Sequence, residues 1–337
     1  MKDINILVTG AGSVMGQSIL KAIDCMKIEN NLNVYLTNSD NLGASFYFDH
    51  LKNCKIIKNL IVPLANDDKY LDSISNYVQK YNIDIVFPGT QHELRKLSLF
   101  HDEHNNVGAL KPDIVELFID KDKTAQLFDK YNIRFPKSTM LNLYNQKEYK
   151  DEKIIIKPKT NSASRDISLI DTKEKYDDVL KNIVDAKIDL SEYVVQEYLD
   201  GLEYTCGCYV DKYTKEINTI IFERTLTLDG ATGYGKIIAN DRVKDYVTKI
   251  AKAVTSEGME YGHFNVQFRI VNGEPICFEV NGRLSSTEAP KAKFGFNSVA
   301  AYIVNVALGK SYDDFNLKQS GQFLRYYEEV YFEDSNI

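Results

Sequence analysis

Apolar and polar residues alternate most clearly over residues 264–283, which read FNVQFRIVNGEPICFEVNGR. Alternation with a period of two is typical of a strand with one buried face, and the central Asn-Gly pair is a frequent hairpin turn. The segment therefore predicts two antiparallel strands joined near residue 272.

The register of this hairpin follows from burial. A two-residue turn at 272–273 sets Val266 opposite Glu279, which puts a carboxylate into an apolar row. A three-residue loop over 272–274 keeps the apolar residues together, so we predict this longer loop. The expected apolar pairs are Val266 with Val280, Phe268 with Phe278, and Ile270 with Ile276.

The other face of the hairpin is polar in this register. Gln267 lies opposite Glu279 and Asn265 opposite Asn281, within cross-strand reach. Amide and carboxylate oxygens suit Mg²⁺ that is shared with substrate phosphates. An ordinary half-exposed hairpin explains the same alternation, so the hairpin alone leaves both interpretations open.

The first hundred residues alternate strand and helix patterns, which predicts a doubly wound parallel sheet. The first turn, Gly10 to Gly16, leads into a helix N-terminus that can receive phosphate. Its spacing is GxGxxxG, which differs from the dinucleotide fingerprint, so a structural turn and a substrate-site loop are alternatives. Expected strands cover 4–9, 33–37 and 83–87, and expected helices cover 14–27 and 68–81.

The rest of the chain predicts a mixed α+β region. We expect three parts: an N-terminal Rossmann-like domain (1–112), a connector and small lobe (113–200), and a large lobe that contains the hairpin (201–337). The fold class is thus α/β, with a doubly wound sheet followed by a two-lobed α+β region. Expected elements are a helical connector at 113–131, strands at 154–157 and 193–197, helices at 173–186, 243–256 and 297–308, and a hairpin at 203–225.

Composition and charge argue against several classes of function. The chain has 337 residues, a net charge of -7 and a pI near 5.4, which give no support to nucleic-acid or membrane-surface binding. The N-terminus lacks a secretory leader pattern and no apolar run is long enough to span a bilayer, so we expect a cytoplasmic protein. The five scattered cysteines predict neither a disulfide framework nor a thiolate metal site.

Several residues in the second region form an ordered set that suggests a nucleotide clamp. Lys123 on the connector and Lys157 at the end of a strand can converge on a phosphate chain. Residues 196–199 end another strand, where free backbone groups can contact an adenine edge. Glu203 follows closely and can accept ribose hydroxyls.

These residues resemble the ATP-grasp superfamily, and most closely one synthetase half of the carbamoyl-phosphate synthase large subunit. The resemblance runs from Gly10 to about Leu308 and is most specific at NVQF (265–268) and FEVNGRLSSTEAPKAKFGF (278–296). The final segment, GQFLRYYEEVYFED (321–334), is similar to the tail of stand-alone members, some of them associated with surface-polysaccharide gene clusters.

The resemblance implies a role for each matching residue, with ATP and Mg²⁺ (or Mn²⁺) as cofactors. It implies catalytic roles for Arg283, at the transferred phosphoryl group or the acyl phosphate, and for Lys157. Metal ligands would be Gln267, Glu279 and Asn281, and nucleotide contacts would be Lys123, Lys157, Ser162, Ser164, Glu197, Tyr198, Leu199 and Glu203, with Gln267 and Glu279 reaching the nucleotide through the metal.

The phosphate loop departs from the family pattern. The family reads roughly KPxxGxGSxG, whereas this chain has KPKTNSASRD from residue 157. Asn161, Ala163 and Asp166 replace the three glycines, although Asn and Asp tolerate left-handed backbone conformations better than other side chains.

We therefore predict a ligase that phosphorylates a carboxylate with MgATP and joins it to an amine or ammonia, with free ammonia and a separate ammonia-supplying chain as the alternative sources. A surface-polysaccharide or amino-acid precursor is the expected substrate type, and the family resemblance allows a homodimer. Alternatives are a small-molecule kinase, a non-catalytic nucleotide sensor and a dinucleotide oxidoreductase. Candidate substrate contacts are Arg224, His263, Ser285, Ser286, Glu288, Lys291, Lys293 and, in the first domain, Glu93 ahead of His92.

Overall fold

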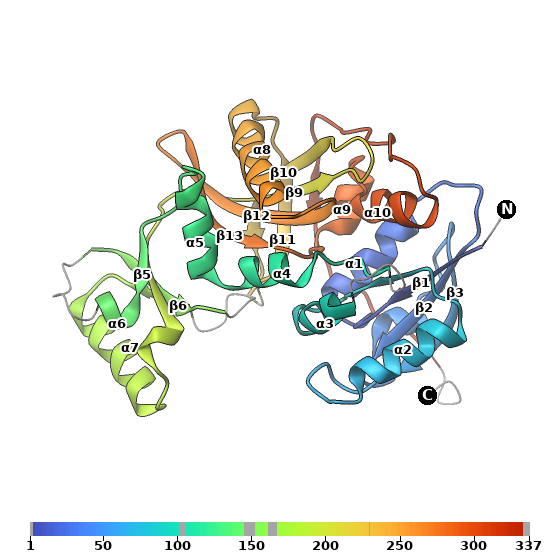
Figure 1. Ribbon diagram of the computed structural model, residues 1–337, viewed down its shortest axis with the longest axis horizontal. Helices are drawn as coiled ribbons and strands as arrows, with labels where there is room; N and C mark the ends of the chain where they lie inside the picture. Colours follow the sequence, from blue (N-terminus) through green and yellow to red (C-terminus); the bar gives the residue numbers. More distant parts are fainter. Residues whose placement is uncertain (1–2, 101–105, 145–151, 161–166, 229, 333–337) are drawn as a thin grey trace.

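A computed structural model describes residues 3–100, 106–144, 152–160, 167–228 and 230–332. The N-terminal domain contains a four-stranded parallel sheet in the order β3-β2-β1-β4. It lies at the right of Figure 1, in blue and cyan. The predicted fold class is confirmed. The elements of this domain are β1 (Ile4–Val8), α1 (Val14–Ile23), β2 (Leu32–Asn38), β3 (Lys55–Ile61), α2 (Tyr70–Lys80), β4 (Ile85–Phe87) and α3 (Gln91–Leu97).

Helix α1 begins at a capped glycine turn. Gly10 has a φ of 49°, a conformation that glycine adopts without strain, and the Ser13 hydroxyl accepts the Gly16 N–H at 2.9 Å. The helix ends at Ile23, four residues earlier than the sequence suggests. The reason is Asp24, whose Oδ1 accepts the backbone N–H groups of Lys52 and Asn53, each at 2.7 Å.

The predicted connector helix is wrong in one respect, because it is two helices. α4 (Pro112–Ile119) ends at Asp120, and α5 (Lys121–Lys130) begins directly after it. The Asp120 carboxylate accepts the N–H groups of Asp122 and Lys123 as an N-cap, which starts a new helix. The break turns the first residue of α5 toward the core, with consequences for the site described below.

The small lobe lies at the left of Figure 1 and contains an antiparallel sheet in the order β5-β8-β6-β7. Its own core is formed by aliphatic residues of the sheet, such as Ile156, packed against residues of α7, such as Ile183. The elements are β5 (Ser138–Met140), α6 (Leu141–Tyr144), β6 (Ile154–Pro158), β7 (Ser168–Ile170), α7 (Lys173–Asp185) and β8 (Tyr193–Glu197).

The large lobe is built on a six-stranded sheet in the order β13-β12-β9-β10-β11-β14. Helices α4, α5 and α8 contact one side of this sheet, and α10 contacts the other. α9 and α10 also pack against α1, which joins the N-terminal domain to the large lobe. The elements are β9 (Glu203–Val210), β10 (Ile217–Leu226), β11 (Thr232–Ile237), α8 (Asp241–Ser256), β12 (Gly262–Val271), β13 (Glu274–Asn281), α9 (Glu288–Lys293), α10 (Ser298–Ala307) and β14 (Gln322–Leu324).

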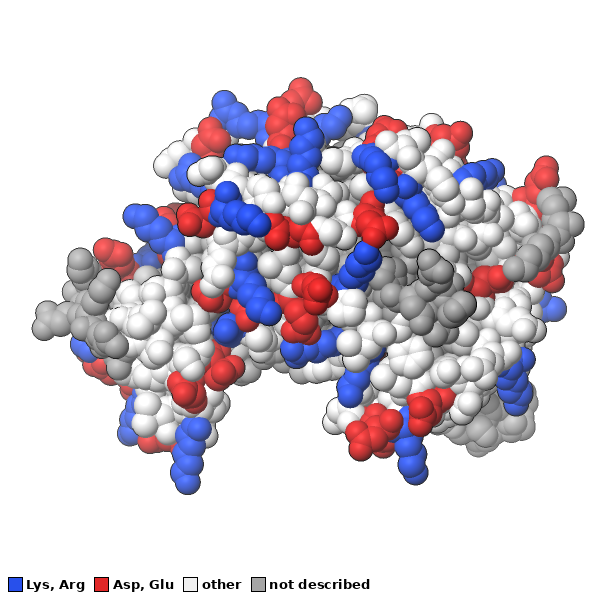
Figure 2. All heavy atoms as spheres, in the orientation of Figure 1, with Lys and Arg blue, Asp and Glu red and all other residues white. Residues whose placement is uncertain are grey.

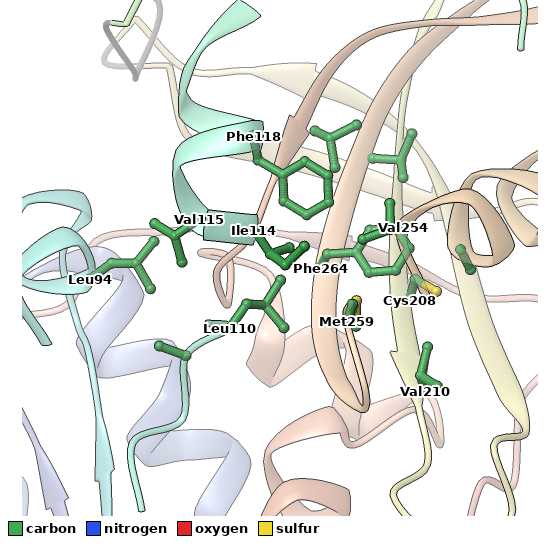
Figure 3. Packing of buried hydrophobic residues seen from close by; sticks show 14 of the residues in the cluster. Leu94, Leu110, Ile114, Val115, Phe118, Cys208, Val210, Val254, Met259 and Phe264 are labelled. Carbon is green, nitrogen blue, oxygen red and sulfur yellow. The ribbon is translucent and has the colours of Figure 1, made fainter. Parts of the chain in front are cut away.

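The apolar side of the large sheet forms a continuous core with α4. Figure 3 shows Phe118 and Ile114 of α4 directed at Phe264 of β12, and the rings of Phe118 and Phe264 are 6.0 Å apart between centroids. The stripe predicted for α8, which includes Val247 and Ile250, is fully buried in the same cluster. This packing fixes which side of β12 faces the core and leaves the other side for polar residues.

The β12–β13 hairpin combines features of both registers considered above. Asn272 and Gly273 form a two-residue turn with φ values of 53° and 79°, so the predicted three-residue loop is wrong. The predicted pairs Gln267 with Glu279 and Asn265 with Asn281 are nevertheless confirmed.

A bulge reconciles the short turn with these polar pairs. The register shifts by one residue after Gln267, so that Phe268 lies opposite Cys277 and Phe278 is the extra residue. Phe278 is only half-buried, whereas Phe268 and Cys277 are fully buried. The predicted Phe268–Phe278 and Ile270–Ile276 pairs are therefore wrong.

Among the described residues, no helix is both long and apolar enough to cross a membrane. On the face shown in Figure 2, lysine and arginine side chains are interspersed with aspartate and glutamate. The same view shows a notch between the small lobe and the N-terminal domain.

Candidate active site

The polar side of the β12–β13 hairpin borders a cavity of about 430 Å³, which we call the hairpin cavity. Asn265 and Gln267 from β12 and Glu279 from β13 line it. The N-terminal domain supplies another wall, with residues 13–15 at the start of α1 and 89–92 after β4. The cavity therefore lies where the large sheet meets the carboxyl ends of two parallel strands, a usual position for ligands in open α/β sheets.

Two of the three oxygen ligands expected from the sequence, Gln267 and Glu279, line this cavity, whereas Asn281 does not. Gln267 and Glu279 are directly opposite each other in the register, and the Asn281 amide donates to Glu279 Oε1 at 3.0 Å. Among the described residues, the Gln267 side chain has no hydrogen-bond partner. Two neighbouring side chains thus have oxygen atoms available to a ligand.

Lys157 is buried beside this pair. Its ammonium donates to Gln196 Oε1 at 2.8 Å and to the Phe278 carbonyl oxygen at 3.4 Å. Burial lowers its pKa to about 8, while the Glu279 carboxylate opposes this change. Gln196 is fixed in turn by donating to the Ser138 hydroxyl at 2.9 Å. The small lobe therefore holds one lysine rigidly at its contact with the hairpin.

Lys121, and not the expected Lys123, accompanies Lys157. Lys123 is exposed on α5, whereas Lys121 is 8% exposed. Burial lowers the pKa of Lys121, and the carboxylates of Glu279 and Asp120 partly restore it. The break at Asp120 produces this arrangement because it makes Lys121 the first residue of α5.

Arg283 connects the large lobe to the N-terminal domain and lines the hairpin cavity. Its Nε donates to Gln91 Oε1 at 2.7 Å, and a terminal nitrogen donates to the Leu284 carbonyl oxygen at 3.1 Å. Burial lowers the pKa of the guanidinium, and Glu279 opposes that effect. The sequence suggests Arg283 but gives no indication that Gln91 orients it.

Arg224 is a second guanidinium that lines the cavity. Glu203, the residue expected at the ribose, accepts from Arg224 Nε at 3.0 Å and from its NH2 at 2.5 Å. Arg269 lies 3.6 Å from the other Glu203 oxygen. Glu203 thus fixes the direction of Arg224, whose side chain is only 9% exposed.

The expected adenine hinge connects the two lobes. Glu197 is exposed and joins Lys137 by two hydrogen bonds, one of them from its own backbone N–H. Tyr198 lies under the Arg269 guanidinium at 5.6 Å, and the Leu199 carbonyl accepts from Arg269 at 3.0 Å. Arg269 thus ties the hinge to the same face of β12 as Gln267.

Some substrate candidates prove to be supports beneath the cavity. Lys291, 2% exposed, donates to Asn265 Oδ1 and Ser285 Oγ at 3.1 Å each and to Glu288 Oε1 at 2.8 Å. Its ammonium therefore orients two lining residues without lining the cavity itself. His263 is fully buried behind them, and burial lowers its pKa to about 4. Ser286 lines the cavity and Lys293 is exposed.

Ser162 and Ser164 lie outside the described residues, as do the loop positions 161–166 in general. Within the described residues, no group of three or more His, Cys, Asp and Glu side chains could hold a metal on its own. The available donors, Glu279 with amide oxygens, fit a hard divalent cation only when phosphate oxygens and water complete its coordination. That is the situation of Mg²⁺ bound with a nucleotide.

Comparison with known proteins identifies a family match in the part of the chain that contains most of these residues. Residues 151–289 match the ATP-grasp domain family. They include the small-lobe strand with Lys157, the Arg224 strand and the whole β12–β13 hairpin.

Solved structures with the same fold are similar over nearly the whole chain. The N5-carboxyaminoimidazole synthetase from Staphylococcus aureus, complexed with ADP, has a TM-score of 0.73 at 15% identity, covering 97% of this chain and 83% of that one. The biotin carboxylase domain of 2-oxoglutarate carboxylase from Hydrogenobacter thermophilus, in complex with MgADP and bicarbonate, has a TM-score of 0.70 at 14% identity, covering 96% and 74%. L-amino acid ligase from Bacillus licheniformis has a TM-score of 0.66 at 13% identity, covering 91% and 74%.

Proposed function

Because this chain contains an ATP-grasp domain, we propose that it is an ATP-dependent ligase that joins a carboxylate to an amine or ammonia through an acyl phosphate. One observation carries the proposal: Gln267 and Glu279 face the hairpin cavity, and Lys121 and Lys157 are buried beside Glu279. Cationic and oxygen donors in this combination match the triphosphate and divalent metal of MgATP.

The nucleotide would lie between the small lobe and the hairpin. Lys157 and Lys121 would neutralise phosphate charge, with Lys121 in the position that the sequence suggests for Lys123. Gln267 and Glu279 would hold Mg²⁺, with Asn281 in support, and the metal would offset charge on the transferred phosphoryl group. Residues 197–199 would border the adenine, as the family resemblance implies.

The substrate carboxylate would occupy the hairpin cavity. Arg224 and Arg283 both line it and are fixed by Glu203 and Gln91, so two guanidiniums are available to an anion. One carboxylate oxygen attacks the γ-phosphorus, and the bond from phosphorus to the ADP oxygen breaks. Arg283 then steadies the acyl phosphate. The amine nitrogen bonds to the carbonyl carbon, inorganic phosphate departs, and the ammonium's two excess protons pass to solvent. Fixed charges need no reorganisation at either step.

Measurement of ADP release from MgATP tests the proposal. Pools of amino acids and sugar acids are supplied with and without ammonia or amines, and Glu279→Gln serves as the inactive control. Release that needs both a carboxylate and an amine, and is lost in the variant, supports the ligase. A stable phosphorylated product in the ³¹P NMR spectrum identifies a kinase instead, and nucleotide binding without release in any pool identifies a sensor.

A further inference from the structure

A second cavity, of about 420 Å³, lies beside the first on the N-terminal domain. We call it the sheet-edge cavity, because its walls are the segments that follow strands β1, β2, β3 and β4 at their carboxyl ends: Gly10, Asn38 and Ser39, residues 62–66, and Thr90, His92 and Glu93. Thr90 and His92 line both cavities. The two spaces therefore share a border at the start of α3.

The two cavities differ in charge. The hairpin cavity contains two arginines, whereas none of the described residues that line the sheet-edge cavity is a lysine or arginine. Glu93 is its one carboxylate. A phosphate or a second carboxylate would therefore meet no lysine or arginine there, and a positively charged group would meet an acid.

Glu93 is built into the floor of this cavity. It is 6% exposed, its Oε1 accepts from the Tyr70 hydroxyl at 3.0 Å, and its Oε2 accepts from the Thr90 hydroxyl at 3.0 Å. A Cβ at position 10 would lie 2.4 Å from Oε2, so the room for this oxygen depends on Gly10. Hydroxyl groups and the Thr90 backbone N–H hold the carboxylate, and no lysine or arginine in the described parts of the chain pairs with it.

A buried carboxylate without a cation is costly. Burial raises the pKa of Glu93, since the ionised form has lost its hydration without gaining an opposite charge. A ligand that brought an ammonium to this position would supply the missing charge. Structural use of Glu93 as a link between α2 and α3 explains the hydroxyl contacts, but not the opening of the carboxylate onto a cavity.

We propose that the sheet-edge cavity binds the amine substrate, with its ammonium at Glu93. This inference rests on the ligase function proposed above. The volume favours a substituted amine over ammonia, because a molecule the size of water occupies only about 30 Å³ in the liquid. The remaining walls, apolar at Val62 to Ala65 and amide-bearing at Asn38 and Asn66, suit an uncharged body such as a sugar or an amino-acid amide.

The arrangement separates the two substrates by charge. The carboxylate lies with Arg224 and Arg283, and the amine lies with Glu93. Both cavities reach the border at Thr90 and His92. The amine nitrogen can approach the activated carbonyl there once its ammonium has released one proton to solvent. Glu93 would repel a carboxylate that entered the sheet-edge cavity. Each substrate would therefore bind in only one of the two cavities.

Matched ligands test the site without knowledge of the natural substrate. Binding of D-glucosamine and of n-propylamine to the full chain with MgADP is compared by NMR titration with binding of D-glucose and n-propanol. We expect each amine to bind about tenfold tighter than its neutral partner in the native protein. In Glu93→Gln this preference should fall to about one, with MgADP affinity unchanged. Equal binding of the paired ligands, or a preference that survives in Glu93→Gln, overturns the proposal.

A second variant provides the test if Glu93→Gln does not fold. Ser39 is exposed at the rim of the sheet-edge cavity, so Ser39→Trp fills the opening without touching Glu93. It should also abolish the amine preference while MgADP binding persists; retained preference counts against the site. If no pool of substrates leads to ADP release, the proposed ligase function is refuted. The comparison of amine and neutral ligands tests the amine site in the sheet-edge cavity independently of that result.

Once a substrate pair is known, kinetics sharpen the test. Glu93→Gln should raise the KM for the amine at least tenfold and leave the KM for the carboxylate within twofold. A merely structural role would change both together.

Discussion

The two faces of the β12–β13 hairpin are formed by the same strands, but one packs in the core and the other borders the hairpin cavity. Val266, Phe268 and Val280 face the core and are at most 2% exposed. Gln267 and Glu279 alternate with them and face the hairpin cavity. Stability and chemistry are thus separated by one residue along the chain, so substitutions on the two faces should give opposite phenotypes.

Loss of the Glu279 charge should have the largest effect. We expect Glu279→Gln to reduce ADP release about 10⁴-fold, about 5 kcal/mol in the barrier, with a melting temperature close to that of the native protein. Glu274→Gln, the same change on the same strand at an exposed ion pair with Arg242, is the matched control. If both variants retain activity, the polar face is not catalytic.

The apolar face should respond in the reverse way. Phe268→Ala should lower the free energy of unfolding by roughly 3–5 kcal/mol, because a fully buried ring leaves a cavity. Phe278→Ala should cost only about 1 kcal/mol, since Phe278 is the half-buried bulge residue. Urea unfolding measures both. Equal losses would mean that the bulge is misplaced.

The two connector lysines extend the comparison to α5. Lys121→Met should weaken MgADP binding roughly 30- to 100-fold by calorimetry, because a buried charged donor to phosphate is removed. Lys123→Met, two residues away and exposed, should change the affinity less than twofold. A large loss of affinity in Lys123→Met and none in Lys121→Met would show that Lys123, as the sequence suggests, binds the phosphate.

The smallest effect concerns pH. Lys157 has a pKa of about 8 in the folded protein, so the ammonium that we propose to bind phosphate is lost as the pH rises through that value. MgADP affinity should therefore fall up to about tenfold between pH 7 and pH 9, with proton uptake on binding above pH 8. Lys157→Arg keeps its charge and should flatten the profile. A flat profile in the native protein would contradict the lowered pKa.

Much of the fold could be predicted because its signals are local. The polar row of Gln267, Glu279 and Asn281 follows from alternation, and the α8 stripe follows from helical periodicity. The bulge could not be predicted from the sequence. A two-residue turn is incompatible with the pairing of Gln267 and Glu279 in a regular hairpin, and the two are compatible only when one residue, Phe278, is left unpaired. The shift of register after Gln267, with Cys277 buried in place of Phe278, reveals it in the structure.

The site was less accessible to sequence reasoning because it lies between domains. Gln91 comes close to the hairpin only when α1 packs against α9 and α10, and no local pattern encodes that docking. Arg224 reaches the cavity from β10, two strands from β12 in the large sheet, and this sheet order is likewise not a local signal. The burial of Lys121 also has a signal in the sequence. Asp120 is a favourable N-cap residue, and an N-cap there makes the following lysine the start of a new helix.

Gly207 on β9 imposes a constraint that would be visible across homologous sequences. A Cβ at this position would lie 2.8 Å from both Cε and Nζ of Lys291, the ammonium that supports Asn265 beneath the cavity. Positions 207 and 291 should therefore covary: a side chain at 207 is admissible only where 291 has become shorter. Homologues in which Lys291 is replaced by a shorter residue could have a side chain at position 207. They would also lack the hydrogen bond that orients Asn265.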